Sequence, residues 1–156
     1  MTTNDNQLFA FEDDFVATLR CIPMAVRLKL DRSGIKLSLR QWSRFTREDR
    51  RDLLETPCAG EAEIETYRAR LVQLVELRAS EAAKPLAELP QALWELAGEA
   101  PPVVTAYARS VGVPPPTALE WRRLTELQRF ALIKLTRDNH DNVNFVPAMR
   151  EFGLAV

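Results

Sequence analysis

The residue types that could support nucleophilic catalysis are two cysteines, Cys21 and Cys58, and the single histidine, His140. A nucleophile needs a base within hydrogen-bonding distance, so one of the thiols would have to meet His140 in the fold. Cys21 falls on or beside the apolar stripe of the first predicted helix, where a free cysteine packs as a small hydrophobic residue. Cys58 follows Pro57 in a predicted turn, where it can be exposed, but no basic neighbour favours its thiolate. The sequence therefore predicts no catalytic residues.

The sequence also lacks the patterns that hold metal ions and nucleotides. Structural zinc needs three or four cysteine, histidine or carboxylate ligands at characteristic spacings, and this chain has no cysteine pair and one histidine. The segment 138–142 (DNHDN) is rich in Asp and Asn, which satisfy helix ends and turns without a metal. Five scattered glycines include no GxGxxG or GxxxxGKS phosphate loop. We therefore expect no metal site and no cofactor.

Positive charge is concentrated early in the chain. From Arg20 to Arg51 there are ten Lys or Arg residues and three acids, whereas Asp52 to Glu99 carries ten acids and four bases. These blocks either solvate helix faces and partly neutralise each other, or the basic block forms an anion-binding surface. The candidate anion- or partner-binding residues are Arg27, Lys29, Lys36, Arg40, Arg44, Arg47, His140 and Asn142.

Two kinds of ligand fit these candidates, and the sequence leaves both open. One is an acidic protein surface, because arginine pairs well with carboxylates. The other is an anionic small molecule, held by a binding protein or an enzyme in a pocket near Cys21, Arg27 and His140. A nucleic-acid partner is disfavoured, because the sequence pI is near 5.9 and no recognised nucleic-acid-binding module is present.

Apolar periodicity predicts the elements of the first half. Apolar residues at three- and four-residue steps from Phe11 to Leu30 indicate a helix, which Pro23 kinks or restarts and Gly34 ends. The alternation across residues 35–39 indicates an extended connection that lays Leu37 and Leu39 on the core, with no partner strand apparent. Further helices are predicted from the Thr46 and Asp49 capping pair to about Glu55, and from Gly60 to Ala79.

The second half is predicted to contain short helices separated by proline-rich connections. Pro114 to Pro116 form a stiff extended spacer. Thr125 with Gln128 forms a capping box at one helix start. The predicted helices lie from Leu89 to Ala97 around Trp94, from Pro101 to Gly112, from Thr125 to about Arg137, and from about Asn144 to before Gly153.

Two stretches, seventy-nine residues apart, share one pattern. We interpret each as a buried tryptophan just outside a helix, followed by a threonine that caps the helix start. Duplication of a helical unit and two independent solutions to the same helix-start problem both explain the pattern. The matched residues are Trp42, Phe45, Thr46, Arg50, Leu53 and Leu54 on Trp121, Leu124, Thr125, Arg129, Leu132 and Ile133.

Composition is that of an ordinary globular domain. The 156 residues are 46% hydrophobic and 28% charged, which indicates an autonomous fold. The N-terminus lacks the basic and apolar regions of a secretory leader, so we expect reduced thiols and a cytoplasmic location. No stretch approaches the roughly 20 uninterrupted apolar residues of a membrane span.

Four segments carry a family resemblance. They are CIPMAVRLKLD (21–31), GIKLSL (34–39) with Trp42, QRFALIKL (128–135) and NVNFVPAMREFGL (142–154). Together they resemble the nitrate reductase associated protein family. The resemblance implies a small bacterial protein associated with nitrate reductase and molybdenum-cofactor genes, with no established activity or catalytic residues to carry over.

The sequence thus predicts an all-α fold, a single helical domain over residues 1–156 with six to eight helices. Segments 11–79 and 100–153 are candidate repeat units, joined by residues 80–99. Through the resemblance, the leading hypothesis is a non-catalytic cytoplasmic accessory protein of nitrate assimilation, which contacts nitrate reductase or the machinery that supplies its molybdenum cofactor. The alternative is the anion-binding protein or enzyme described above.

Overall fold

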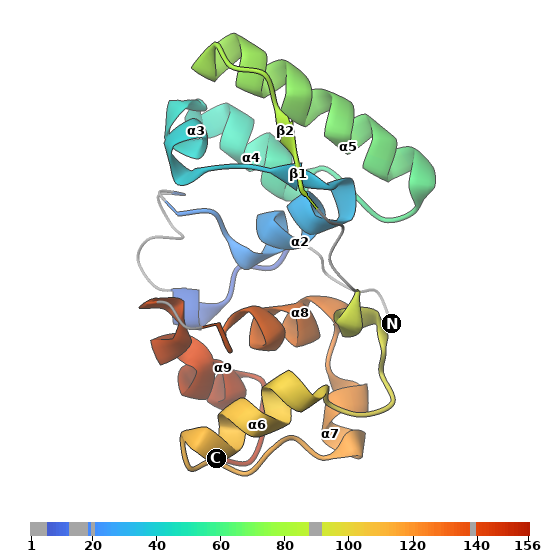
Figure 1. Cartoon of the computed structure of the whole chain (residues 1–156), viewed down its shortest axis with the longest axis vertical. Coiled ribbons are helices and arrows are strands. Elements are labelled where there is room, and N and C mark those ends of the chain that lie inside the picture. Colours follow the sequence, from blue (N-terminus) through green and yellow to red (C-terminus); the bar gives the residue numbers. More distant parts are fainter. Residues whose placement is uncertain (1–5, 13–18, 20, 88–91, 138–139) are drawn as a thin grey trace. The chain divides into compact units, whose positions relative to one another are not determined.

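The computed structural model describes residues 6–12, 19, 21–87, 92–137 and 140–156, and for residues 140 and 141 it describes the backbone alone. The described residues contain eight α-helices and one two-stranded sheet, so the predicted all-α fold is confirmed (Figure 1). They divide into two compact units. The N-terminal unit contains the described residues within 5–8 and 13–90, and the C-terminal unit those within 9–12 and 91–156.

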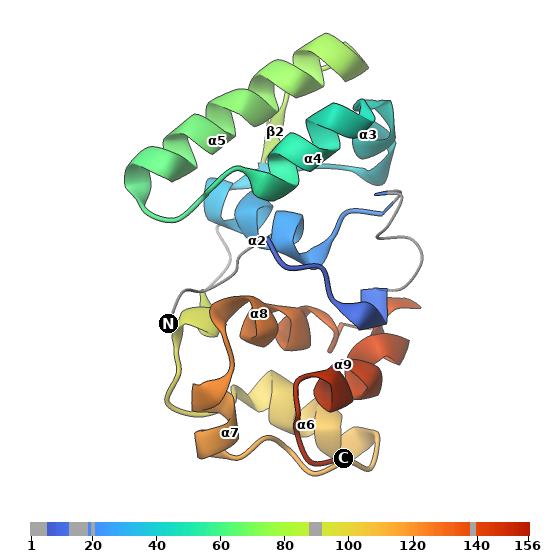
Figure 2. The same ribbon diagram turned by 180° about the vertical axis from the view of Figure 1, so that it is seen from behind.

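The N-terminal unit places α2 against both α4 and α5 (Figure 2). Its core includes Leu28, Leu53, Tyr67 and Leu71, each at most 1% exposed. At its C-terminal end α5 continues directly into a π-helical turn, Val75–Ala79. The elements are α2 (Met24–Ser33), β1 (Ile35–Lys36), α3 (Leu39–Arg44), α4 (Arg47–Glu55), α5 (Glu61–Leu74) and β2 (Lys84–Pro85).

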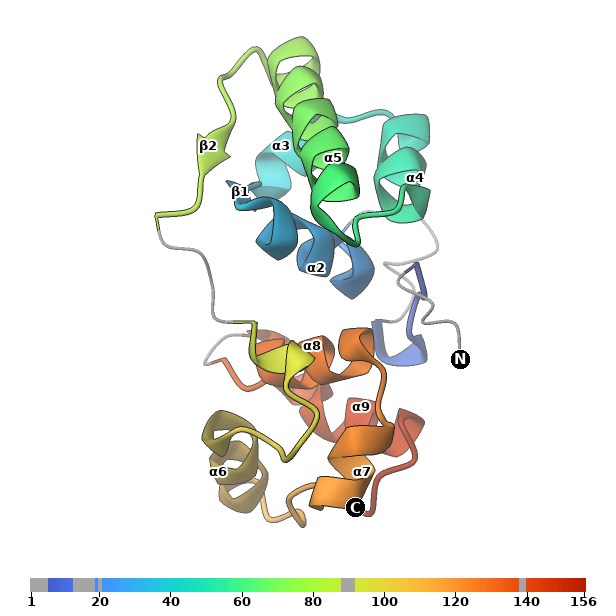
Figure 3. The same cartoon turned by 90° about the vertical axis from the view of Figure 1, so that its right-hand side faces the viewer.

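The C-terminal unit is organised around α8, which packs against α6, α9 and the 3-10 turn that carries Trp94 (Figure 3). Phe130 of α8 meets the Trp94 ring edge to face, with 5.2 Å between the ring centroids. The α-helices are α6 (Pro102–Ser110), α7 (Ala118–Arg123), α8 (Glu126–Lys134) and α9 (Phe145–Glu151). The 3-10 turns are Ala10–Glu12, Leu93–Glu95 and His140–Asn144.

Proline and glycine set the helix ends as predicted in the N-terminal unit. Pro23 precedes α2, because it lacks the amide donor that an interior helical position requires. Gly34 follows α2 with φ of 69°, a left-handed conformation that glycine adopts without strain. The apolar stripe that was predicted to begin at Phe11 crosses residues 13–18 and 20, which lie outside the described residues.

Two predictions for residues 35–39 are wrong. The extended segment does have a partner, since β1 pairs with β2 in antiparallel register, with Ile35 opposite Pro85. Leu39 does not lie on the core, because it opens α3 and is 56% exposed. The partner strand was missed because only two residues pair, and such a short strand carries no periodicity in the sequence.

The two matched tryptophan stretches form two helix pairs, α3–α4 and α7–α8. Each indole lies in a different position from the one predicted. Trp42 and Trp121 lie inside the short helices α3 and α7 rather than outside a helix. Each short helix has its own capping box, formed by Ser38 with Gln41 in α3 and by Thr117 with Glu120 in α7. A helix of six residues is marginal alone, so these caps and the buried indole fix its position.

The joints between the paired helices have the same backbone conformation. Phe45 and Leu124 both lie in the extended region, with φ and ψ of −72° and 148° and of −70° and 150°. The threonines that follow, Thr46 and Thr125, share a ψ of 163° and form the predicted capping boxes of α4 and α8. The matched geometry is what both a duplication and two independent helix starts would give, so the repeat units 11–79 and 100–153 stay a prediction.

Candidate functional site

The basic block divides into side chains that hold the N-terminal unit together and side chains that face solvent. Lys29 belongs to the first group, since it is fully buried. Its ammonium donates to the Leu54 and Thr56 carbonyls at 2.6 and 2.7 Å, and to Asn6 Oδ1 at 2.7 Å. A cation at the C-terminal end of α4 also opposes the negative end of the helix dipole. Lys29 is therefore an internal helix cap, and its ammonium is not exposed to a partner.

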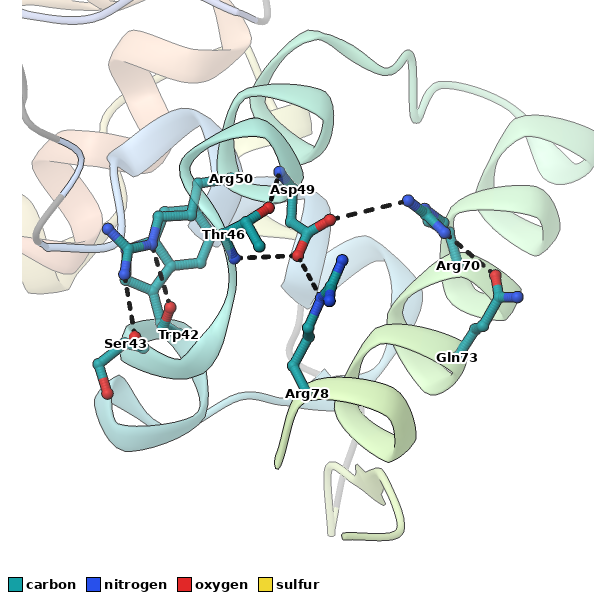
Figure 4. Close-up of polar contacts among 8 residues, drawn as sticks. All are labelled: Trp42, Ser43, Thr46, Asp49, Arg50, Arg70, Gln73 and Arg78. Carbon is teal, nitrogen blue, oxygen red and sulfur yellow. Dashed lines mark hydrogen bonds and ion pairs between the residues drawn. The ribbon is translucent and has the colours of Figure 1, made fainter. Parts of the chain in front are cut away.

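Arg50 is half-buried and bonds within the N-terminal unit, and its bond to the tryptophan carbonyl recurs in the C-terminal unit. Its Nε donates to the Trp42 carbonyl at 3.1 Å and its Nη2 to the Ser43 carbonyl at 3.1 Å (Figure 4). The equivalent Arg129 donates to the carbonyl of the matched Trp121 at 3.4 Å and to the Leu124 carbonyl at the joint at 2.6 Å. Burial lowers the pKa of the Arg129 guanidinium. Each arginine therefore clamps the joint between its two helices.

Three further basic side chains bond within the N-terminal unit. Arg27 Nε donates to the Ile22 carbonyl at 3.0 Å, and Arg32 Nη1 approaches the Cys58 carbonyl at 3.4 Å. Arg40 forms an ion pair with Glu81, which lies just after the π-helical turn. Arg32 and Arg40 therefore tie α2 and α3 to segments that follow α4 and α5, whereas Arg27 bonds to the residue before Pro23 at the start of α2.

Lys36, Arg44, Arg47 and Arg51 are the exposed remainder of the basic block. Arg44 ends α3, Arg47 begins α4, and Arg51 lies one turn further along α4. Among the described residues, none of these four is assigned an ion-pair or hydrogen-bond partner.

Arg47 and Arg51 line an open hollow on α4 together with Glu48 and Asp52. The two arginines and two acids carry no net charge together. A free anion would meet both signs of charge there, whereas a protein surface can place acids against the arginines and bases against the carboxylates. The hollow therefore favours a partner with mixed charges over a simple anion.

Asp49 joins α4 to α5 and to the π-helical turn. Its carboxylate accepts from the Thr46 amide at 2.9 Å and from Arg78 Nε at 2.8 Å, and Arg70 Nη2 lies 3.9 Å away (Figure 4). Burial raises the pKa of the Asp49 carboxyl, but the Thr46 and Arg78 hydrogen bonds outweigh it, and the pKa lies below its ordinary value. Asp49 is therefore a charged cap at neutral pH.

Sequence reasoning missed Arg70, Arg78 and Glu81 as partners of the basic block. All three lie in the acidic stretch, so a count of local charge hides the two arginines. One signal in the sequence pointed to such partners. Asp49 places a charged carboxylate at the capping position that the neutral Gln128 occupies in the matched helix. A buried carboxylate requires a cation, which the sequence could not identify.

The predicted thiol and histidine pocket remains untested. Both expectations for the thiols are wrong, because Cys21 is exposed rather than packed as a small hydrophobic residue, and Cys58 is only 1% exposed. Burial raises the pKa of the Cys58 thiol, which disfavours a reactive thiolate. The side chain of His140 is outside the described residues, and Asn142 accepts from the Tyr107 hydroxyl through its backbone carbonyl at 3.4 Å.

Among the described residues, no three His, Cys, Asp or Glu side chains come together in a group that could bind a metal ion. Within those residues, too, every helix is either too short or too polar to cross a membrane.

Comparison with known proteins identifies the family. Residues 8–152 match the family described as conserved nitrate reductase-associated protein, and the chain belongs to this family. No curated protein and no solved structure matches the chain. The family's description links the chain to nitrate reductase, and the resemblance seen in the four sequence segments is confirmed.

Proposed function

We propose that this member of the conserved nitrate reductase-associated protein family is a non-catalytic cytoplasmic accessory protein of nitrate assimilation. It acts by protein contact, either on nitrate reductase or on the proteins that supply its molybdenum cofactor. The family's description supports the link to nitrate reductase.

The observation that carries the proposal is the exposed basic group at the α3–α4 joint. Arg44, Arg47 and Arg51 remain accessible, while Lys29 and Arg50 from the same block bond to internal carbonyls. Guanidinium groups pair well with carboxylates of a partner, and accessible ones are common at protein interfaces. The acids beside Arg47 and Arg51 would favour a partner of matching charge pattern and disfavour a purely acidic surface.

The test is affinity capture with a tagged chain from nitrate-grown cells. We expect the wild-type chain to retain nitrate reductase or a cofactor-synthesis protein, and the retained amount to fall as salt screens the arginines. The double variant Arg47→Glu, Arg51→Glu should lose the partner, because it reverses both positive charges of the hollow and leaves four acids there.

A matched control comes from the second helix pair. The double variant Arg122→Glu, Arg123→Glu makes the same change of charge at two exposed residues in the last turn of α7. It should retain the partner as the wild type does. Recovery of neither class of protein by the wild type, or equal loss in both double variants, would contradict the proposal.

A further inference from the structure

Two guanidinium groups converge on a single carboxylate in the N-terminal unit. Arg78 Nε lies 2.8 Å from Asp49 Oδ2, and Arg70 Nη2 lies 3.9 Å from Asp49 Oδ1 (Figure 4). The three groups together carry one net positive charge. The Asp49 side chain is 5% exposed, whereas those of Arg70 and Arg78 are 40% and 36% exposed. The unbalanced charge is therefore open to a ligand from solvent.

Most N–H donors of Arg70 and Arg78 make no hydrogen bond to the described residues. Arg78 bonds through Nε alone, and Arg70 bonds through Nη1 to Gln73 Oε1 at 3.1 Å. A guanidinium has five N–H donors, arranged to grip a carboxylate or phosphate with two parallel bonds. Among the described residues, the Nη groups of Arg78 and the Nε of Arg70 have no assigned partner.

The matched helix α8 shows that the cap itself does not require a charge. Gln128 occupies the position equivalent to Asp49, and its Oε1 accepts from the Thr125 amide at 2.9 Å. The corresponding distance from the Thr46 amide to Asp49 is also 2.9 Å. Since a neutral side chain makes the same capping bond, the charge of Asp49 has a separate role, which is to hold Arg78 and Arg70.

The backbone that carries Arg78 is also unusual. Arg78 lies within the π-helical turn Val75–Ala79, and Ser80 follows in a left-handed conformation with φ of 54°. Single π-helical turns are rare and are often found at functional sites. The wider turn changes the direction in which Arg78 leaves the helix, and a left-handed serine stores some strain.

We propose that Arg70 and Arg78 form a binding site for one carboxylate or other oxyanion group, with Asp49 orienting the two guanidinium groups. The group comes either from a small free anion or from an acidic side chain of a protein. The site uses none of the arginines of the α4 hollow, so it stands independently of the proposed function.

The test is an NMR titration of the full chain, which follows the arginine Nε–Hε signals. The probes are sodium acetate, sodium phosphate and a capped Gly-Glu-Gly peptide, each replacing chloride at constant ionic strength. We expect saturable shifts for Arg70 and Arg78. Arg109, an exposed arginine in the last turn of α6, should show no saturable shift.

Substitutions separate binding from a purely structural role. Arg70→Gln should weaken anion binding by about tenfold, because it removes one charged donor. Asp49→Gln keeps a capping acceptor, as Gln128 does, but removes the carboxylate that orients the two guanidinium groups, so it should weaken binding by about tenfold. If Asp49→Gln does not fold, Arg78→Gln takes its place and should weaken binding as Arg70→Gln does.

The outcomes are distinct. Tighter binding of the peptide than of acetate identifies a protein side chain as the source, and equal or tighter binding of acetate or phosphate identifies a free anion. Shifts that do not saturate with any probe, or equal affinity in the wild type and Arg70→Gln, would overturn the proposal. Failure of the wild type to capture either class of protein would contradict the proposed function and leave this titration unchanged, so the two proposals fail separately.

Discussion

Lys29 provides the sharpest test of how the N-terminal unit is held together. We expect Lys29→Met, which keeps most of the aliphatic volume, to destabilise the unit by about 3 kcal/mol. The buried ammonium donates three hydrogen bonds of 2.6–2.7 Å, two of them to carbonyls at the end of α4. Methionine cannot donate, so these oxygens lose their partner.

The magnitude follows from two opposing contributions. A buried acceptor that loses its donor costs about 1–3 kcal/mol, so the three oxygens that lose the Lys29 ammonium cost together about 3–9 kcal/mol before any offset. Removing the ammonium also removes the cost of burying it, which is several kcal/mol. The difference is a loss of about 3 kcal/mol, with the Leu54 and Thr56 carbonyls left without this donor.

Amide hydrogen exchange measures the loss within the unit itself. The amides of Leu71 and Leu74 in the buried face of α5 should exchange faster in Lys29→Met, by the factor that corresponds to about 3 kcal/mol. Lys36→Met is the control, because Lys36 is exposed, and it should change stability by less than about 0.5 kcal/mol. A loss below about 1 kcal/mol in Lys29→Met would refute the assigned role.

Three further predictions concern the helix clamps, the charged cap and the thiols. Arg129→Leu should lower stability to urea by about 3 kcal/mol, and more than Arg50→Leu does, because Arg129 is 6% exposed and Arg50 is partly exposed. The pKa of Asp49 is lower in the folded chain than its ordinary value, so its contribution is complete at neutral pH and is lost as the pH falls through this lowered pKa. Melting temperatures should therefore fall less on acidification in Asp49→Asn than in the wild type, and an equal fall would contradict this assignment. A thiol-exchange reagent at pH 8 should modify Cys21 quickly and Cys58 slowly, since Cys58 is buried with a raised pKa, and equal rates would show that the Cys58 environment opens readily.

Features that depend on neighbours in the sequence were predictable. The capping boxes at Thr46 and Thr125 were recognised because a cap links a residue only to the third residue after it. Pro23 and Gly34 set the ends of α2 for equally local reasons, since one lacks a donor and the other accepts a positive φ.

Prediction from local sequence patterns was wrong where a capping pattern and an alternating apolar pattern overlapped. Ser38 with Gln41 is also a capping box, but the alternating apolar residues before it favoured an extended connection through Leu39. The helix α3 was therefore missed, and Trp42 was placed outside a helix. A helix of six residues has little propensity of its own, and contacts such as the bond from Trp42 Nε1 to the Leu19 carbonyl at 2.8 Å stabilise it.

By itself the sequence determined the helical class, the capped helix starts, the paired tryptophan pattern and the family. Tertiary structure alone decided which charges are available for binding. Lys29, Arg40 and Arg47 look alike in the sequence, yet one is buried on carbonyls, one pairs with Glu81 and one lines an open hollow. Capping is a contact between near neighbours, whereas the fate of a long cationic side chain depends on oxygen atoms that the fold brings from distant segments.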